Sequence, residues 1–319
     1  MPMHIRNCPC CDSESATKIF DFDYEYSSNI LNVDPLLMRM IGFEKDKVSD
    51  LVECNNCKVV YIKTDFEVDI YLDEYYSLLT RMGQQRKEEN TDQGKPKTWS
   101  DKIRGKELIN KSVLDLLRAY SRNKRNDPVG DSKIKVLDFG CGWGNWLSNL
   151  ENINIVEAYG YDINQFKVDH VKKRGLYAST DYQEIFEQGP FDIIVCNDVI
   201  EHVDQPIKIV SEISSLMKDG SVLHAAVPRF TKKDIKKSVR LMEKGKRLKA
   251  FHLGHINYLT PQSFEKIMRD YDLRPINAQT LTLPWVGGLN KADLREFAKS
   301  AAKLFLYNFG TKYCNTWIK

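Results

Sequence analysis

The sequence predicts an α/β fold with an open, mainly parallel sheet, preceded by a small cysteine-rich module. Three observations predict it. Residues 134–144 form an apolar run that enters a glycine-rich turn, and apolar residues then resume at helical spacing. Two further apolar runs, 158–162 and 191–198, each end in an acid, beside the edge where open α/β sheets bind their ligands. Two Cys-x-x-Cys pairs lie near the N-terminus.

The glycine turn indicates the kind of ligand. An acid ends the strand, and glycines follow at every second position with a cysteine between the first two: Asp138, Gly140, Cys141, Gly142 and Gly144. Asn145 stands where the dinucleotide fingerprint Gly-x-Gly-x-x-Gly has its third glycine, so the spacing argues against that fingerprint. A carboxylate at this point suits a cationic, amine-bearing ligand. The alternative is a glycine turn in an α/β protein that binds no nucleotide.

The pattern Asp-x-Gly-x-Gly-x-Gly resembles the class I S-adenosylmethionine (SAM)-dependent methyltransferases, and residues 131–228 resemble their core in element order. The resemblance implies a Rossmann-like, seven-stranded methyltransferase core with SAM as cofactor. It places Asp162 at the ribose hydroxyls, as acids are placed in dinucleotide sites. The match is loosest around 178–181, near the adenine. The cofactor-binding residues expected in full are Asp138, Gly140, Cys141, Gly142, Gly144, Asp162, Ile163, Asp181, Asn197 and Asp198.

Other elements follow from apolar spacing and capping residues. Trp146, Leu147 and Leu150 predict a helix after the turn, and helices are expected at about 206–216 and, amphipathic, at 107–120. Thr260 and Pro261 read as the N-cap and first residue of a further helix. Residues 273–283 predict one or two antiparallel strands. Residues 290–319 predict a C-terminal helix that closes the fold or mediates a homodimer.

Composition limits the classes of protein. The chain has 319 residues with 42% hydrophobic residues, and no apolar run of 18 residues predicts a membrane span. We see no secretory signal, and so expect a cytoplasmic protein with reduced thiols. The net charge of +3 does not by itself indicate nucleic acid as a partner.

The cysteine pairs predict a structural zinc site. We expect Cys8, Cys11, Cys54 and Cys57 to hold Zn²⁺ in a closed tetrahedron. Cys10 could replace Cys8 or Cys11, and unrelated cysteines or a redox pair are the alternatives. Residues 57–76 resemble the zinc-ribbon modules that precede the methyltransferase core in bacterial enzymes acting on sugars and surface polysaccharides. Related sugar C-methyltransferases carry a further large C-terminal domain, so the length favours methylation of a hydroxyl.

These expectations divide the chain into four parts. Residues 1–80 form the zinc-ribbon module, with an insertion at about 21–48. Residues 81–130 form a linker and a helix that covers the cofactor. Residues 131–289 form the SAM-dependent core, with a basic helical insertion at 229–250. Residues 290–319 form the C-terminal helix.

Two histidines are candidate general bases, because methyl transfer to oxygen requires loss of a proton. His202 follows Glu201 beyond the strand at 191–197. His255 and Tyr258 lie in a stretch that resembles the His-x-x-Tyr-x-Thr-Pro segment bordering many methyltransferase sites. Either histidine could instead be structural, and an acidic hydroxyl or an amine would need no base. No clear set of carboxylates and histidines in the sequence predicts a second, catalytic metal.

The acceptor is the open question. Residues 231–249 carry nine Lys or Arg and predict a basic amphipathic helix. This helix could bind a phosphate-bearing acceptor, or it could simply expose its charged face to solvent. We expect a sugar or glycan-related small molecule that is methylated on a hydroxyl. The alternatives are an RNA or tRNA methyltransferase, a C-methyltransferase of a nucleotide-linked sugar, and a non-enzymatic zinc module with a relict cofactor domain.

Overall fold

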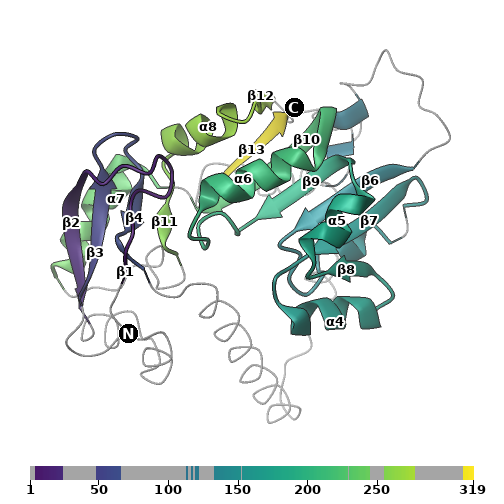
Figure 1. Cartoon of the computed structure of the whole chain (residues 1–319), viewed down its shortest axis with the longest axis horizontal. Coiled ribbons are helices and arrows are strands. Elements are labelled where there is room, and N and C mark those ends of the chain that lie inside the picture. Colours follow the sequence, from purple (N-terminus) through teal and green to yellow (C-terminus); the bar gives the residue numbers. More distant parts are fainter. Residues whose placement is uncertain are drawn as a thin grey trace, which may run out of the picture.

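The computed structural model describes two sheets and the helices packed against the larger one (Figure 1). The described residues are 4–23, 48–65, most of 113–121, 133–151, 153–228, 230–244, 255–276 and 312–319. The smaller sheet lies at one end of the molecule, and helices α4 (Gln165–Lys173) and α5 (Tyr182–Gln188) lie at the other.

The larger sheet has seven strands and confirms the predicted Rossmann-like α/β fold. Its inner strands are parallel, and the last two pairings, β10–β13 and β13–β12, are antiparallel. From one edge to the other, the order is β12 (Arg274–Ile276), β13 (Lys312–Ile318), β10 (Met217–Pro228), β9 (Phe191–Asn197), β6 (Ile134–Phe139), β7 (Val156–Tyr161) and β8 (Tyr177–Ser179).

The centre of this sheet is the core of the protein. Six consecutive residues of β9, from Phe191 to Cys196, are buried, as expected for a strand covered on both faces. Leu137 of β6 and Leu223 of β10 are also fully buried beside it. Since each buried aliphatic or aromatic side chain contributes roughly 1.5–3 kcal/mol, this centre holds the strand ends in place.

The N-terminus of one helix carries the capping residues that the sequence predicts. Helix α8 (Pro261–Arg269) begins after Thr260, whose side chain accepts a hydrogen bond from the Ser263 amide, and Pro261 occupies the first turn. Its buried face includes Phe264, Ile267 and Met268. Helix α6 (Pro206–Ser215) matches the predicted 206–216. Helix α7 (Lys232–Met242) starts with a capping box formed by Thr231 and Asp234.

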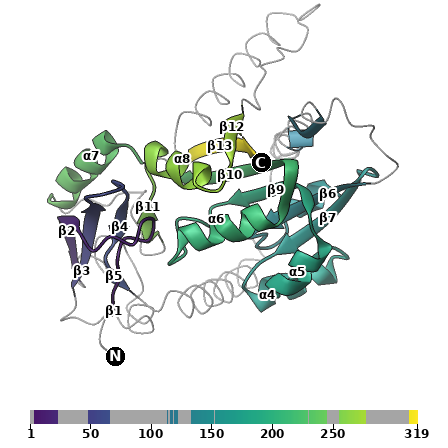
Figure 2. The same cartoon turned by 45° about the horizontal axis from the view of Figure 1, so that its top comes forward.

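The smaller sheet joins two distant parts of the chain (Figure 2). Strands β2 (Ala16–Asp23), β3 (Val48–Cys54) and β4 (Val60–Ile62) pair in order, and β11 (Asn257–Tyr258) adds to β4 as the fourth strand. Strands β1 (His4–Ile5) and β5 (Thr64–Asp65) pair with each other. The N-terminal module therefore completes its sheet with residues from the later half of the chain.

One predicted helix is wrong, and another is wrong at its C-terminal end. Only a short 3-10 turn, η2 (Leu147–Asn149), follows the glycine turn where we expected a longer helix. The C-terminal helix at 290–319 is corrected at its end, where Lys312–Ile318 form β13 between β10 and β12. Thr316 and Trp317 are buried there. The pairing of this short segment with β10 stabilises it as a strand and not as a helix. The strand expected at 273–283 is β12, of three described residues.

Several expectations fall outside the described residues. These are the linker at 81–106, most of the insertion at 21–48, the aromatic residues at 71–76, residues 245–250 and most of the predicted C-terminal helix. The described residues of 113–121 are helical, with Val113, Leu116 and Ala119 buried. No helix in the described part of the chain has the length and apolar character needed to cross a bilayer.

Candidate functional site

The glycine turn leaves the end of β6 and is tied to the end of β7. The amides of Gly140 and Cys141 both donate to the carbonyl oxygen of Tyr161, at 2.7 and 2.9 Å. The three alternating glycines have positive φ angles of 82°, 53° and 68°, which L side chains rarely adopt. The amide of Gly142 donates to Oδ2 of Asp162 at 2.8 Å. Backbone and acid therefore meet at the carboxyl edge of the sheet.

The glycines differ in what surrounds them. A Cβ built on Gly140 would lie 2.3 Å from Cγ2 of Val199, whereas one built on Gly142 would meet no atom within 4 Å. The first glycine is needed for packing between β6 and the segment after β9. The second faces open space, as a backbone that a ligand approaches should.

We expect Gly140→Ala to destabilise the protein by more than about 2 kcal/mol, because it adds both a clash and a strained φ. Thermal or urea unfolding of the cofactor-free protein measures this. Gly142→Ala shares the strained φ without the clash and is the matched control. Equal loss of stability in the two variants would contradict the role assigned to Val199.

Asp138 lies beneath the turn and is 4% exposed. Burial, together with the nearby charge of Asp162, raises the pKa of its carboxyl group to about 7. Such a buried carboxyl group ionises more readily when a positively charged group lies beside it. Its position at the end of β6 places it where an amine-bearing ligand would be recognised.

Asp162 already organises its surroundings. Besides the Gly142 amide it accepts a hydrogen bond from the Asn164 amide at 3.0 Å, and Nζ of Lys167 lies 3.8 Å from Oδ1. Asn164 in turn caps α4 through the Lys167 amide. The carboxylate is thus held in one orientation before any ligand arrives.

The remaining predicted cofactor residues lie along the same edge of the sheet. Ile163 follows Asp162 and is 51% exposed, an apolar side chain open to solvent. Asp181 caps α5 by accepting from the Gln183 amide. Asn197 ends β9, and Asp198 has a φ of 56°, with its amide bonded to the Ala226 carbonyl. A non-glycine residue in this conformation often marks a functional site.

Three predicted catalytic residues come together beside this edge. The rings of His202 and His255 are in edge-to-face contact with centroids 4.7 Å apart, and Nε2 of His202 lies 3.8 Å from Oε1 of Glu201. One ligand-type atom of each residue lies within 4.8 Å of the others. Tyr258, the fourth predicted residue, belongs to β11, and its ring packs on that of Phe230.

The sequence did not predict the residues that hold this group. The Glu201 carbonyl accepts from the amides of Ile256 and Asn257, and Nδ2 of Asn257 donates to the carbonyls of Ile200 and Val203. Arg6 also reaches this region from the N-terminal module. Its guanidinium donates to the carbonyls of Ile62, Asp204 and Ile256 and to Oδ1 of Asn257. No local pattern marks Arg6, whereas Asn257 stands within the predicted His-x-x-Tyr segment.

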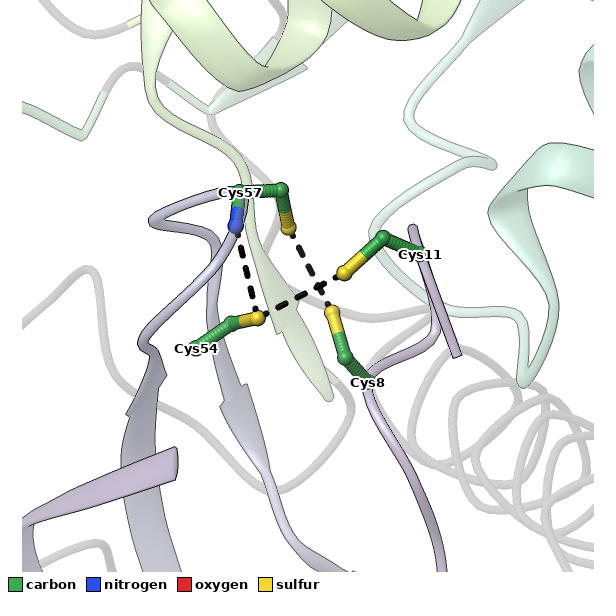
Figure 3. A group of neighbouring side chains, drawn as sticks. All are labelled: Cys8, Cys11, Cys54 and Cys57. Atoms are coloured by element: carbon green, nitrogen blue, oxygen red, sulfur yellow. Dashed lines mark hydrogen bonds between the residues drawn. The ribbon is translucent and has the colours of Figure 1, made fainter. Parts of the chain in front are cut away.

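Four cysteines converge at the start of the smaller sheet (Figure 3). Sγ of Cys8 lies 3.4 Å from Sγ of Cys57, and Sγ of Cys11 lies 3.5 Å from Sγ of Cys54. These distances exclude disulfides, whose sulfurs are about 2.05 Å apart. Four sulfurs at about 2.3 Å from one zinc ion would lie roughly 3.8 Å apart, so the cluster fits a tetrahedral site.

The arrangement of the sulfur atoms indicates which cysteines could be metal ligands. Cys10 is buried but is not among the four grouped sulfurs. Although burial opposes ionisation, the backbone amides of Cys57 and Asn56 lower the pKa of Cys54 to about 7. Neighbouring thiols and burial raise the pKa values of Cys8, Cys11 and Cys57, so it is the arrangement of the four sulfurs that suggests zinc at this place.

A profile of the methyltransferase domain family matches residues 106–278, more than half of the chain. The chain belongs to this family. It is a class I SAM-dependent methyltransferase domain, with the seven-stranded sheet of that fold and a four-cysteine cluster at its N-terminal side.

Curated relatives match part of the methyltransferase. The ubiquinone biosynthesis O-methyltransferase of Actinobacillus pleuropneumoniae serotype 7 is 30% identical over 139 residues, which cover 39% of this chain and 56% of that protein. The mitochondrial ubiquinone biosynthesis O-methyltransferase of Candida albicans is 24% identical over 128 residues, covering 37% and 39%. The chain thus spans about half or less of the length of these relatives.

Among solved structures, the methyltransferase is similar to magnesium protoporphyrin IX methyltransferase from Synechocystis PCC 6803 with bound SAH. The sequence identity is 15%, the TM-score is 0.45, and the alignment covers 78% of this chain and 98% of the other.

The residues present in the methyltransferase fit SAM on their own chemistry. The open space over Gly142 accommodates a ligand against the backbone, and Asp138 offers a carboxyl group for an ammonium. Asp162 carries lone pairs beyond those used by its two amide donors. These features come from the strand ends of β6 and β7, which the parallel order of the sheet brings side by side.

Proposed function

We propose that this methyltransferase transfers the methyl group of SAM to a hydroxyl group of a sugar or glycan-related small molecule. The observation that carries the proposal is the position of Glu201, His202 and His255 near the end of β9, the strand that pairs with β6 next to the glycine turn. The matched O-methyltransferases support oxygen as the methylated atom.

The chain's own residues would divide the work of binding. Asp138 accepts hydrogen bonds from the amino group of the cofactor, and Asp162 accepts them from the ribose hydroxyls. Ile163 and Asp181 border the adenine, while Asn197 and Asp198 line the side toward the acceptor. SAM supplies an electrophilic methyl group on a positively charged sulfur.

The histidine group would prepare the acceptor. In-line attack on the methyl carbon forms the O–CH₃ bond while the S–CH₃ bond breaks and its electron pair stays on sulfur, so alignment of the hydroxyl is the first requirement. The hydroxyl must also lose its proton, and His202 and His255 are the bases on this side of the sheet. The Glu201 carboxylate lies beside the His202 imidazole, and Asn257 fixes the backbone on both sides of these two residues through the carbonyls of Ile200 and Val203.

A phosphate-bearing acceptor is favoured by α7. Lys233, Lys236, Lys237 and Arg240 are all exposed on this helix, and Asp234 is the one acidic residue within it. In both views α7 lies beside the smaller sheet (Figures 1 and 2). A nucleotide-linked sugar combines such a phosphate with hydroxyl groups.

The test uses SAM with a ¹³C-labelled methyl group and three acceptors: a panel of nucleotide-linked sugars, a catechol and a folded RNA. We expect one labelled methyl per sugar, with the carbon chemical shift of a methyl bound to oxygen. Label on a sugar carbon would overturn O-methylation. Label on the RNA or the catechol alone would overturn the sugar assignment.

We expect His202→Ala and His255→Ala to lower the turnover number by about a hundredfold or more, since proton transfer contributes 10²–10⁴-fold. SAM affinity should change by less than about threefold, because Asp138 and Asp162, the residues assigned to the amino group and the ribose, lie at the ends of β6 and β7. Steady-state kinetics and calorimetry separate the two effects. Turnover at the wild-type rate in both variants would contradict the assignment.

A further inference from the structure

We propose that Glu201, His202 and His255 together bind one divalent transition-metal ion, at a site separate from the four-cysteine cluster. The sequence did not predict this site, because Glu201 and His202 are 53 or more residues away from His255 along the chain. The fold brings the three together through the amides of Ile256 and Asn257, which bond to the Glu201 carbonyl at 3.0 Å each.

The distances fit ligands around one ion. Two ligand atoms that each lie about 2.0–2.2 Å from the same ion are roughly 3–4 Å apart, and Nε2 of His202 lies 3.8 Å from Oε1 of Glu201. This separation is longer than a direct hydrogen bond. Since the three candidate ligand atoms lie within 4.8 Å of one another, side-chain rotations that move an atom by about 1 Å would complete the site.

Burial strengthens the case. Glu201 is 2% exposed and His202 is 8% exposed, so water can solvate the carboxylate only poorly. A carboxylate in such surroundings is stabilised by a nearby positive charge.

The donor set indicates the class of ion. Two imidazoles and one carboxylate suit Zn²⁺, Mn²⁺, Fe²⁺ or Co²⁺, whereas Mg²⁺ prefers oxygen ligands only. Three protein ligands leave positions free for water or for an acceptor oxygen. His255 is half-buried, so the group is open on one side. The four cysteines, by contrast, would occupy all four coordination positions of a zinc ion.

The consequence for catalysis rests on the proposed function, although binding of the ion does not. A hydroxyl group bound to such an ion has a lowered pKa, so its proton can pass to solvent water. The resulting oxygen then attacks the methyl carbon, and the S–CH₃ electron pair remains on sulfur as before. In this case the ion, and not a free imidazole, activates the hydroxyl.

The test first adds one equivalent of Zn²⁺ per chain, which the four thiolates take up, then titrates Mn²⁺ into the full chain and follows free Mn²⁺ by electron paramagnetic resonance. We expect one Mn²⁺ per chain. Glu201→Gln and His255→Gln should each weaken binding at least tenfold. His170→Gln is the matched control, because His170 is exposed on α4 and lies outside the group, and it should leave binding unchanged.

A second measurement is made on the wild-type protein, and variants serve only to assign its signals. Bound Mn²⁺ should broaden the imidazole proton signals of two of the six histidines, and His202→Gln and His255→Gln identify them. Substoichiometric Mn²⁺, or binding that survives both Glu201→Gln and His255→Gln, would overturn the metal site. Full methyl transfer by protein freed of this ion would overturn its chemical role and leave the proposed function standing.

Discussion

Asp138→Asn is expected to weaken SAM binding about ten- to a hundredfold and, at the same time, to stabilise the cofactor-free protein above neutral pH. The loss of affinity follows from one charge-assisted hydrogen bond, worth about 1.5–3 kcal/mol. The gain in stability follows because burial and the charge of Asp162 raise the pKa of the Asp138 carboxyl group to about 7.

The sign of the pH dependence follows from the raised pKa. The folded state holds the Asp138 proton more tightly than the unfolded state, so the wild-type free energy of unfolding falls as pH rises from about 4 to about 7. Asparagine has no proton to lose. The stability advantage of the variant should therefore grow by about 2 kcal/mol between about pH 5.5 and pH 8, as measured by urea unfolding.

Asp192→Asn is the matched control, on the same sheet at the opposite end of β9. Although burial opposes ionisation there too, hydrogen bonds from Lys218, Tyr120 and the Lys135 amide lower the pKa of Asp192. Its replacement should destabilise the protein at about pH 8 and leave SAM affinity unchanged. If Asp138→Asn behaved in the same way, Asp138 would be a structural acid and not a cofactor ligand.

Loss of zinc from the four-cysteine cluster is expected to increase local unfolding of residues 201–204 and 255–258. The strands that carry the proposed cofactor residues should stay folded. Strand β4 of the smaller sheet pairs with β11, and the Ile62 amide bonds to the Ile256 carbonyl. Arg6, two residues before Cys8, connects the same region to Asp204 and Asn257. Metal binding at closed sites of this kind contributes directly to folding.

Hydrogen exchange followed by mass spectrometry measures the effect. In Cys54→Ser we expect amides at 255–258 and 201–204 to exchange at least tenfold faster, and those of β9 to be unchanged. SAM affinity should stay within about threefold of the wild type. Cys10→Ser, outside the cluster, should keep one zinc and the wild-type exchange pattern. Faster exchange in β9 as well would mean that the module supports the whole fold.

The sequence was most informative where function depends on local backbone. The strand, the acid and the alternating glycines of 138–144 lie next to each other in the chain, and their positive φ angles are a property that only glycine provides readily. The cysteine pairs could also be recognised from the sequence, because the two metal ligands in each pair lie within four residues of each other. Thr260 and Pro261 likewise mark the start of α8 through local capping.

Features built from distant segments could not be predicted in this way. Glu201, His202 and His255 meet only because the 255–257 backbone bonds to the Glu201 carbonyl. Arg6 acts across roughly 200 to 250 residues of sequence, and β11 is a two-residue strand without a periodic pattern. Strand β13 contains the aromatic and β-branched residues typical of strands, but its place between β10 and β12 depends on segments distant in the chain.

Calorimetric titration of the purified wild-type protein with SAM tests the central claim most directly. The claim is that the ends of β6 and β7, with Asp138, the glycine turn and Asp162, form a SAM site. We predict saturable binding of one SAM per chain, lost or greatly weakened in Asp138→Asn. The absence of saturable binding by the folded wild-type protein would contradict it.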